Sequence, residues 1–138
     1  MRVMGLDIGD KRIGVAMSDP VGILASPLTQ IQRTGTEVAI EAILELVRQY
    51  DVKRILAGLP YSIDGSMGPQ AQKVESFLKK LSERLDIPIE IWDESYTTVA
   101  AESKMIEGGV RKDRRKKQID AAAAAIILQE YLDTIRTK

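Results

Sequence analysis

The chain has 138 residues, 44% hydrophobic and 29% charged, and its 20 basic and 20 acidic side chains give a formal net charge of zero. This balance excludes a uniformly basic nucleic-acid binder, although it allows a local basic patch. Cysteine and histidine are both absent, which excludes disulfides, metal sites built on thiolate or imidazole, and catalysis by histidine. Any chemistry must therefore use carboxylates, lysine, tyrosine, hydroxyl groups or a metal bound by oxygen. The length predicts a single domain over residues 1–138.

The first predicted element is a β-hairpin, with strands over residues 2–8 and 13–18 and a turn between them. Asp7 lies inside the first strand among apolar neighbours. Strand interiors rarely contain aspartate, and a buried carboxylate is normally paired, hydrogen-bonded or bound to a metal. Asp7 is therefore the first candidate for a reacting centre; the alternative is an ordinary hairpin in which it caps a backbone group. Three glycines in the hairpin also indicate close approach of a ligand or another backbone: Gly5, Gly9 and Gly14.

The rest of the chain predicts alternating strands and helices. After an edge-like strand over residues 22–31 we expect a helix over 36–50, a strand over 53–59, a loop over 61–68, a helix over 69–85, a strand over 87–93, a helix over 97–107, a basic loop over 110–117 and a helix over 118–135. This order predicts an α/β fold, a mixed β-sheet flanked by helices on both faces. Neither a signal peptide nor an apolar stretch approaching the ~20 residues that span a bilayer is visible, so we expect a cytoplasmic protein without a membrane partner.

Carboxylates recur at two further points of this layout. Asp93 and Glu94 close a predicted strand, and α/β sheets tend to bind ligands at the carboxyl ends of strands. Asp120 precedes a run of alanines in the last predicted helix and shares a helix face with Ala123 and Ala124. Each has a plain alternative, since Asp93 or Glu94 could cap the next helix and Asp120 could interact with the helix dipole. Together with the aspartate of the first strand, they indicate a site for Mg²⁺ or Mn²⁺, which can hydrolyse phosphodiesters by a two-metal mechanism.

Four motifs in order along essentially the whole chain resemble the YqgF/RuvX family: LDIGDKRIGVAMSD, AGLP followed by DGS, DE followed by TT, and IDAAAAAIILQ. Members of this family have a ribonuclease H-like fold and are described as Holliday-junction resolvases or as nucleases that mature the small-subunit ribosomal RNA precursor. The resemblance implies that Asp7, Glu94 and Asp120 are metal-binding catalytic acids, with Asp93 supporting its neighbour. It also implies a nuclease that acts in 5′-end maturation of pre-16S rRNA. One departure is visible, because many relatives have arginine directly after the Asp-Glu pair, where this chain has Ser95.

The densest positive charge lies in residues 110–117, directly before Asp120. A charge run is usually a solvated surface, but this one adjoins the acidic residues and could contact the phosphates of RNA or DNA. Ser66 could contact phosphate from its loop, whereas Thr97 either caps a helix or contacts phosphate. The candidate substrate-binding residues are Lys11, Arg12, Ser66, Thr97, Arg111, Arg114, Arg115, Lys116 and Lys117.

Two other functions remain open from the sequence. An actin-like or sugar-kinase-like ATPase also combines an early aspartate with glycines in a phosphate-binding hairpin, but it needs two such domains to enclose ATP. A catalytically silent nucleic-acid-binding module would retain the fold without cleaving anything. The sequence does not separate an RNA precursor from a branched DNA junction in recombination or repair, and we expect a monomer or a weak homodimer.

Overall fold

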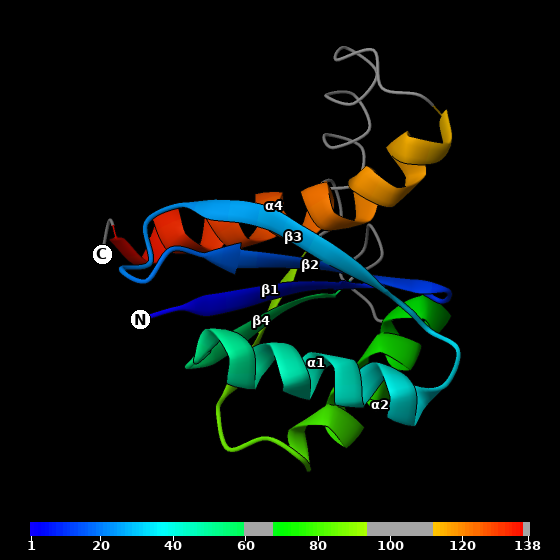
Figure 1. Ribbon diagram of the computed structural model, residues 1–138. Coiled ribbons are helices and arrows are strands. Elements are labelled where there is room, and N and C mark those ends of the chain that lie inside the picture. The colour runs from blue at the N-terminus through cyan, green and yellow to red at the C-terminus, as the bar shows by residue number, and fades with distance from the viewer. Residues whose placement is uncertain (60–67, 94–111, 137–138) are drawn as a thin grey trace.

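The computed structural model describes residues 1–59, 68–93 and 112–136, and within the last range it describes the side chains of residues 121–135. Its centre is a five-stranded sheet in the order β3-β2-β1-β4-β5 (Figure 1). The strands are β1 (Val3–Ile8), β2 (Arg12–Ser18), β3 (Ala25–Gln32), β4 (Arg54–Leu59) and β5 (Ile89–Asp93). β2 is antiparallel to β1 and β3, whereas β1, β4 and β5 run parallel to one another. The predicted mixed sheet is confirmed.

Helices cover both faces of this sheet, as predicted. α1 (Thr36–Tyr50) and α2 (Pro69–Ser82) lie on one face, and α4 (Lys112–Arg136) lies on the other (Figure 1). α1 has the predicted bounds and ends at Asp51, which adopts the left-handed conformation that stops a helix. α2 begins with a proline in its first turn, where the missing N–H costs no helical hydrogen bond. None of the helices described is long and apolar enough to cross a membrane.

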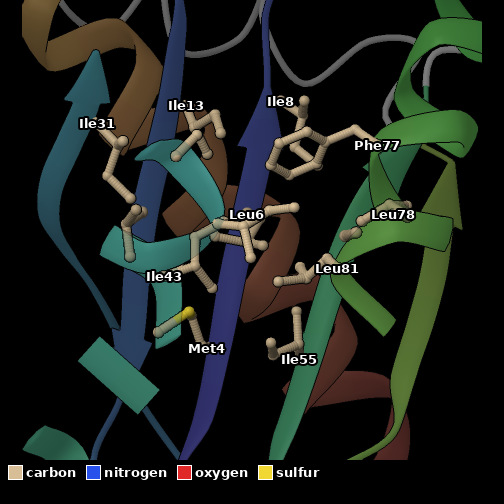
Figure 2. Packing of buried hydrophobic residues seen from close by; sticks show 14 of the residues in the cluster. Met4, Leu6, Ile8, Ile13, Ile31, Ile43, Ile55, Phe77, Leu78 and Leu81 are labelled. Carbon is tan, nitrogen blue, oxygen red and sulfur yellow. The ribbon is translucent and has the colours of Figure 1, made fainter. Parts of the chain in front are cut away.

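Strand alternation directs neighbouring side chains of β1 to opposite faces of the sheet. Met4, Leu6 and Ile8 pack with residues of α1 and α2 in the larger apolar cluster (Figure 2). Val3 belongs instead to a smaller cluster that contains residues of α4, among them Leu128. All of these side chains are buried. The odd-numbered positions of β1 therefore face α4, and the fifth residue of the strand, an aspartate, is one of them.

The last helix differs from its prediction. We expected a basic loop over residues 110–117 and a helix from residue 118, but α4 already begins at Lys112. Lysine and arginine are good helix formers, and residues 112–136 contain neither glycine nor proline, so the helix continues through the basic run. Smaller shifts occur at β3, which begins three residues later than predicted, and at β5, which begins two residues later. The predicted helix over residues 97–107 and most of the predicted loop over 61–68 lie outside the described residues.

Candidate active site

Asp7 lies near the edge of the sheet where the parallel strands end. Because β1, β4 and β5 run in the same direction, their carboxyl ends meet along one edge. Asp7 is the last residue but one of β1, half-buried, on the face that α4 covers. Asp93 is exposed and ends β5 at the same edge. The fold thus brings two acidic segments, separated by 86 positions in the numbering (93 − 7), to one edge with a single strand between them.

The strand positions beside Asp7 carry no side chain beyond a hydrogen atom. Gly14 is its partner on β2. On the other side, Leu6 pairs with Ala57 of β4, and continuing that register by one residue sets Gly58 beside Asp7. Glycine within a strand often marks a place where a ligand or another backbone approaches. No side chain from the neighbouring strand positions therefore covers the Asp7 carboxylate, which leaves space beside it for a ligand.

Gln30 extends the same row and was missed by the sequence analysis. It pairs with Gly14 across the β2–β3 ladder, two strands from Asp7. It is half-buried, and its Oε1 is buried without a hydrogen-bond partner among the described residues. Buried polar atoms normally have such partners, so this carbonyl is an acceptor held beside the candidate site. Only the pairing of the strands relates Gln30 to the aspartate, and no local pattern in the sequence could have found it.

α4 crosses this face of the sheet very closely. A Cβ atom added to Gly5 would lie 3.0 Å from the Cβ of Leu128 and 3.1 Å from the carbonyl oxygen of Ala124. Such distances are shorter than ordinary van der Waals contacts, so only glycine fits here without displacing the helix. The predicted close approach of another backbone at this glycine is confirmed.

The path of α4 sets Asp120 level with Asp7. The Tyr131 hydroxyl accepts a 2.7 Å hydrogen bond from Arg54 at the start of β4, so the later turns of α4 lie at the amino ends of the parallel strands. From the close contact at the glycine of β1, two strand residues lead about 6.6 Å forward to Asp7. On the helix side of the same contact, Ala124 lies opposite Gly5, and the four residues from Ala124 to Asp120 extend about 6 Å toward the carboxyl ends of the strands. The helix backbone at Asp120 therefore reaches the same level as Asp7.

Two residues of α4, Gln129 and Tyr131, fix the helix on the sheet through three hydrogen bonds. The hydrogen bond to Tyr131 raises the pKa of Arg54, and burial raises the pKa of Tyr131, so both side chains keep their protons and the bond persists over the whole neutral range. The amide of Gln129 makes two further bonds to the backbone before and within β3. Its Oε1 accepts from the Ala25 N–H at 2.9 Å, and its Nε2 donates to the Ile23 carbonyl at 2.9 Å.

The structure describes only part of the predicted site. Among the substrate-binding candidates, Lys11 is exposed in the hairpin turn and Arg12 is half-buried at the start of β2. Asp120 and the basic residues 114–117 are described as backbone of α4. Within the side chains that are described, no three acidic residues gather as a metal site. The remaining predicted site residues lie outside the described residues: Ser66, Glu94, Thr97 and Arg111.

Two solved structures share this architecture. The structure of T. thermophilus RuvC in complex with a Holliday junction substrate matches with a TM-score of 0.63 and 16% identity, covering 99% of this chain and 96% of that one. The crystal structure of the Fowlpox virus resolvase with substrate Holliday junction DNA matches with a TM-score of 0.57 and 13% identity, covering 98% and 99%. At these identities the likeness concerns the fold alone. The protein has the ribonuclease H-like fold of RuvC, which confirms the predicted fold class.

Sequence comparison identifies the family. The family model described as "RuvX: Holliday junction resolvase" matches residues 1–134, and the chain belongs to this family. A relative from Desulforamulus reducens is 48% identical over 134 residues, which cover 97% of this chain and 98% of the relative, and it is named "Putative pre-16S rRNA nuclease". A relative from Thermoanaerobacter pseudethanolicus carries the same name and is 46% identical over 139 residues, 100% of each chain. The family predicted from the four motifs is confirmed.

Proposed function

We propose that this protein is a nuclease that hydrolyses phosphodiester bonds in 5′-end maturation of pre-16S rRNA. The names of its relatives, which match it over nearly their whole length, support both the reaction and the substrate. The observation that carries the proposal is the position of Asp7. This carboxylate lies at the carboxyl edge of the sheet beside Gly14, on the face where α4 brings Asp120 to the same level.

Asp7, Glu94 and Asp120 would hold Mg²⁺ or Mn²⁺ at this edge. The chain has no histidine or cysteine, and carboxylate oxygens are the donors that these hard cations prefer. Asp7 is only half-buried and has a glycine beside it, so the surroundings fit a hydrated ion. When bound, such ions activate water for attack on phosphorus and stabilise the leaving oxygen. The chain itself contributes three carboxylates from three elements: β1, the segment after β5, and α4.

The positive side chains around this edge would bind the substrate backbone. Lys11 and Arg12 lie in the hairpin that follows Asp7, and the basic residues 111–117 precede Asp120. Because residues 114–117 are helical, successive positions lie about 100° apart around the helix axis, and a single nucleic-acid strand would contact only a subset of them. Ser66 and Thr97 complete the proposed set of phosphate contacts.

The family description favours a second candidate substrate, the four-way DNA junction. RNA and branched DNA present the same phosphodiester group to the same carboxylates, so the chemistry of the site serves both. Symmetric cleavage of a junction requires two active sites, and therefore a homodimer. The weak homodimer predicted from the sequence would meet that need, whereas trimming one end of an rRNA precursor requires a single site.

A cleavage assay on three end-labelled substrates tests the proposal: 16S rRNA precursor with its 5′ extension, an unrelated linear RNA, and a four-way DNA junction. We expect removal of the 5′ extension in Mg²⁺, no cleavage in EDTA, and no cleavage by Asp7→Asn in either condition. Cleavage of the junction alone would replace rRNA by DNA as the substrate. Activity that survives in Asp7→Asn would refute the proposed site.

A further inference from the structure

A second basic surface lies on the other side of the same sheet edge, away from α4. A hollow of about 280 Å³ opens between the β1–β2 turn, the amino end of α1 and the side of α2 that carries Lys73 and Lys80. Its lining includes three cationic side chains, Arg33, Lys73 and Lys80, and one carboxylate, Asp10, which leaves two net positive charges among the described residues. We infer that this hollow, here called the α1–α2 pocket, binds a backbone phosphate of the RNA outside the bond that is cut. The inference rests on the proposed nuclease function.

Arg33 is held in place before any ligand arrives. Its Nη1 donates a 2.8 Å hydrogen bond to the carbonyl oxygen of Gly9, and its guanidinium lies 4.8 Å from the centre of the Phe77 ring. Phe77 is buried, so the aromatic face that supports the cation is fixed by the core. A guanidinium has five N–H donors in a planar fork, and the bond to Gly9 uses one of them. An ordered arginine of this kind binds phosphate with little loss of side-chain entropy.

The amino end of α1 adds further positive potential to the pocket. Thr36, the first residue of the helix, lines the hollow. The residue before it is Gly35, which makes no side-chain capping hydrogen bond. The first backbone N–H groups of a helix have no partner within the helix, and they carry the positive end of its dipole. The nearby acidic residue Glu37 is engaged by Arg84 at 2.9 Å, so its charge is offset.

α2 supplies the exposed cations of the pocket, Lys73 and Lys80. Lys73, Ser76 and Lys80 line it from positions three and four residues apart, which share one face of a helix. Lys73 is 65% exposed, and its Nζ lies 4.0 Å from the carboxylate of Asp10, which is 60% exposed. An exposed pair at that separation is weak, so a phosphate can compete with the carboxylate for the ammonium group.

The position of the pocket suits the path of a substrate. Gly9, whose carbonyl holds Arg33, follows Asp7 by two residues, about 7 Å along the chain. The basic turns of α4 begin on the opposite face of the sheet (Figure 1). A strand that passes over the edge at Asp7 therefore meets positive charge on both sides. The pocket would hold phosphates on one side of the cut and the α4 residues those on the other side.

Paired charge variants test the inference. The double variant Lys73→Gln/Lys80→Gln removes two charges from the pocket, and Lys53→Gln/Lys79→Gln removes two from exposed positions outside its lining. Binding of a long single-stranded RNA is measured in Ca²⁺ at several salt concentrations. We expect the slope of log affinity against log salt to become shallower by about 0.7 for each phosphate that the pocket variant no longer binds, and to change little in the control.

A second variant is expected to tighten RNA binding, which a loss of folding could not do. Asp10→Asn removes the only negative charge in the described lining and should tighten RNA binding by up to about fivefold, the scale of one exposed charge interaction. Equal slopes in the pocket and control variants, or unchanged binding in Asp10→Asn, would overturn the inference. If the wild type still cleaves precursor rRNA in Mg²⁺, the proposed function stands without the pocket; if it neither binds nor cleaves RNA, both fail.

Discussion

The two faces of the sheet share their strands but are packed in different ways. Toward α1 and α2, β1 presents Met4, Leu6 and Ile8, and the space is filled by large aliphatic and aromatic side chains (Figure 2). Toward α4 it presents Gly5, whose missing side chain lets the helix approach so closely that an added Cβ would lie 3.0 Å from the Cβ of Leu128. Large side chains on one face supply most of the apolar burial. The glycine on the other face lets α4 lie close to β1, and Asp7, the carboxylate proposed to act in catalysis, lies on that face.

The largest effect should come from the α4 face and leave stability untouched. Asp7→Asn and Asp120→Asn should each lower Mg²⁺-dependent cleavage by orders of magnitude, and the double variant should be little worse than either, because ligands of one metal assembly act as a unit. Thermal stability should stay constant or rise, since gathered carboxylates repel one another without metal. Asp51→Asn, at an exposed position after α1, is the matched control. Losses that add up in the double variant would mean that the two aspartates act separately.

The α1–α2 face should respond in the opposite way. Leu6→Ala truncates a fully buried side chain and should lower the free energy of unfolding by about 2–5 kcal/mol, while the cleavage rate per folded molecule stays near that of the wild type. Urea denaturation measures the first quantity, and activity normalised to folded protein measures the second. Val38→Ala, at a side chain that is 58% exposed, should change neither. A specific loss of activity in Leu6→Ala would show that the two faces are coupled.

Gly5→Ala should lower both the stability and the cleavage activity, because it alters the contact that sets the distance between α4 and β1. The added Cβ would meet the Cβ of Leu128 and a backbone oxygen, atoms that move only with the whole helix, so we expect a loss of about 1–3 kcal/mol. The helix shift should also lower cleavage. At Gly35, by contrast, an added Cβ meets nothing nearer than 4.0 Å, and Gly35→Ser should not lower stability because serine caps a helix well. Full activity in Gly5→Ala would show that the site tolerates a displaced α4.

The smallest effect concerns the loop between β2 and β3, which lies at the end of the sheet opposite the candidate site. The carboxylate of Asp19 accepts hydrogen bonds from the backbone N–H groups of Ile23 and Leu24 at 2.7 and 3.4 Å, and the first of these chiefly lowers the pKa of Asp19 below its ordinary 3.8. A lowered pKa stabilises the fold above that value, and the contribution disappears as the pH falls below it. The protection of the Ile23 amide against hydrogen exchange, measured relative to the intrinsic exchange rate at each pH, should therefore decrease below about pH 4 in the wild type. Asp19→Asn should remove that pH dependence; an unchanged profile would contradict this assignment.

The sequence predicted those features that depend on local pattern. Alternation identified β1 and the unusual Asp7 within it, and the helical spacing of apolar residues gave α1 its observed bounds. The basic run before Asp120 was wrongly predicted as a loop, because its charges were weighed and its helix propensity was not. Gln30 and Arg33 could not have been found in this way. The residues that surround them belong to other strands and helices, and a local sequence pattern does not predict which elements pack together.

The amide of Gln129 has a consequence for Asp120, nine residues earlier in α4. A helix is a rod with a fixed pitch, so holding one residue sets both the height and the rotational phase of every other. The two bonds from Gln129 to the chain around β3 act as such a clamp. A slip of one residue would turn the helix by about 100° and move it by about 1.5 Å, so the backbone at Asp120 would change both its height and its rotation relative to Asp7. The placement of Asp120 in the proposed ligand set is therefore controlled about 13 Å away, by a side chain that bonds to the backbone around β3.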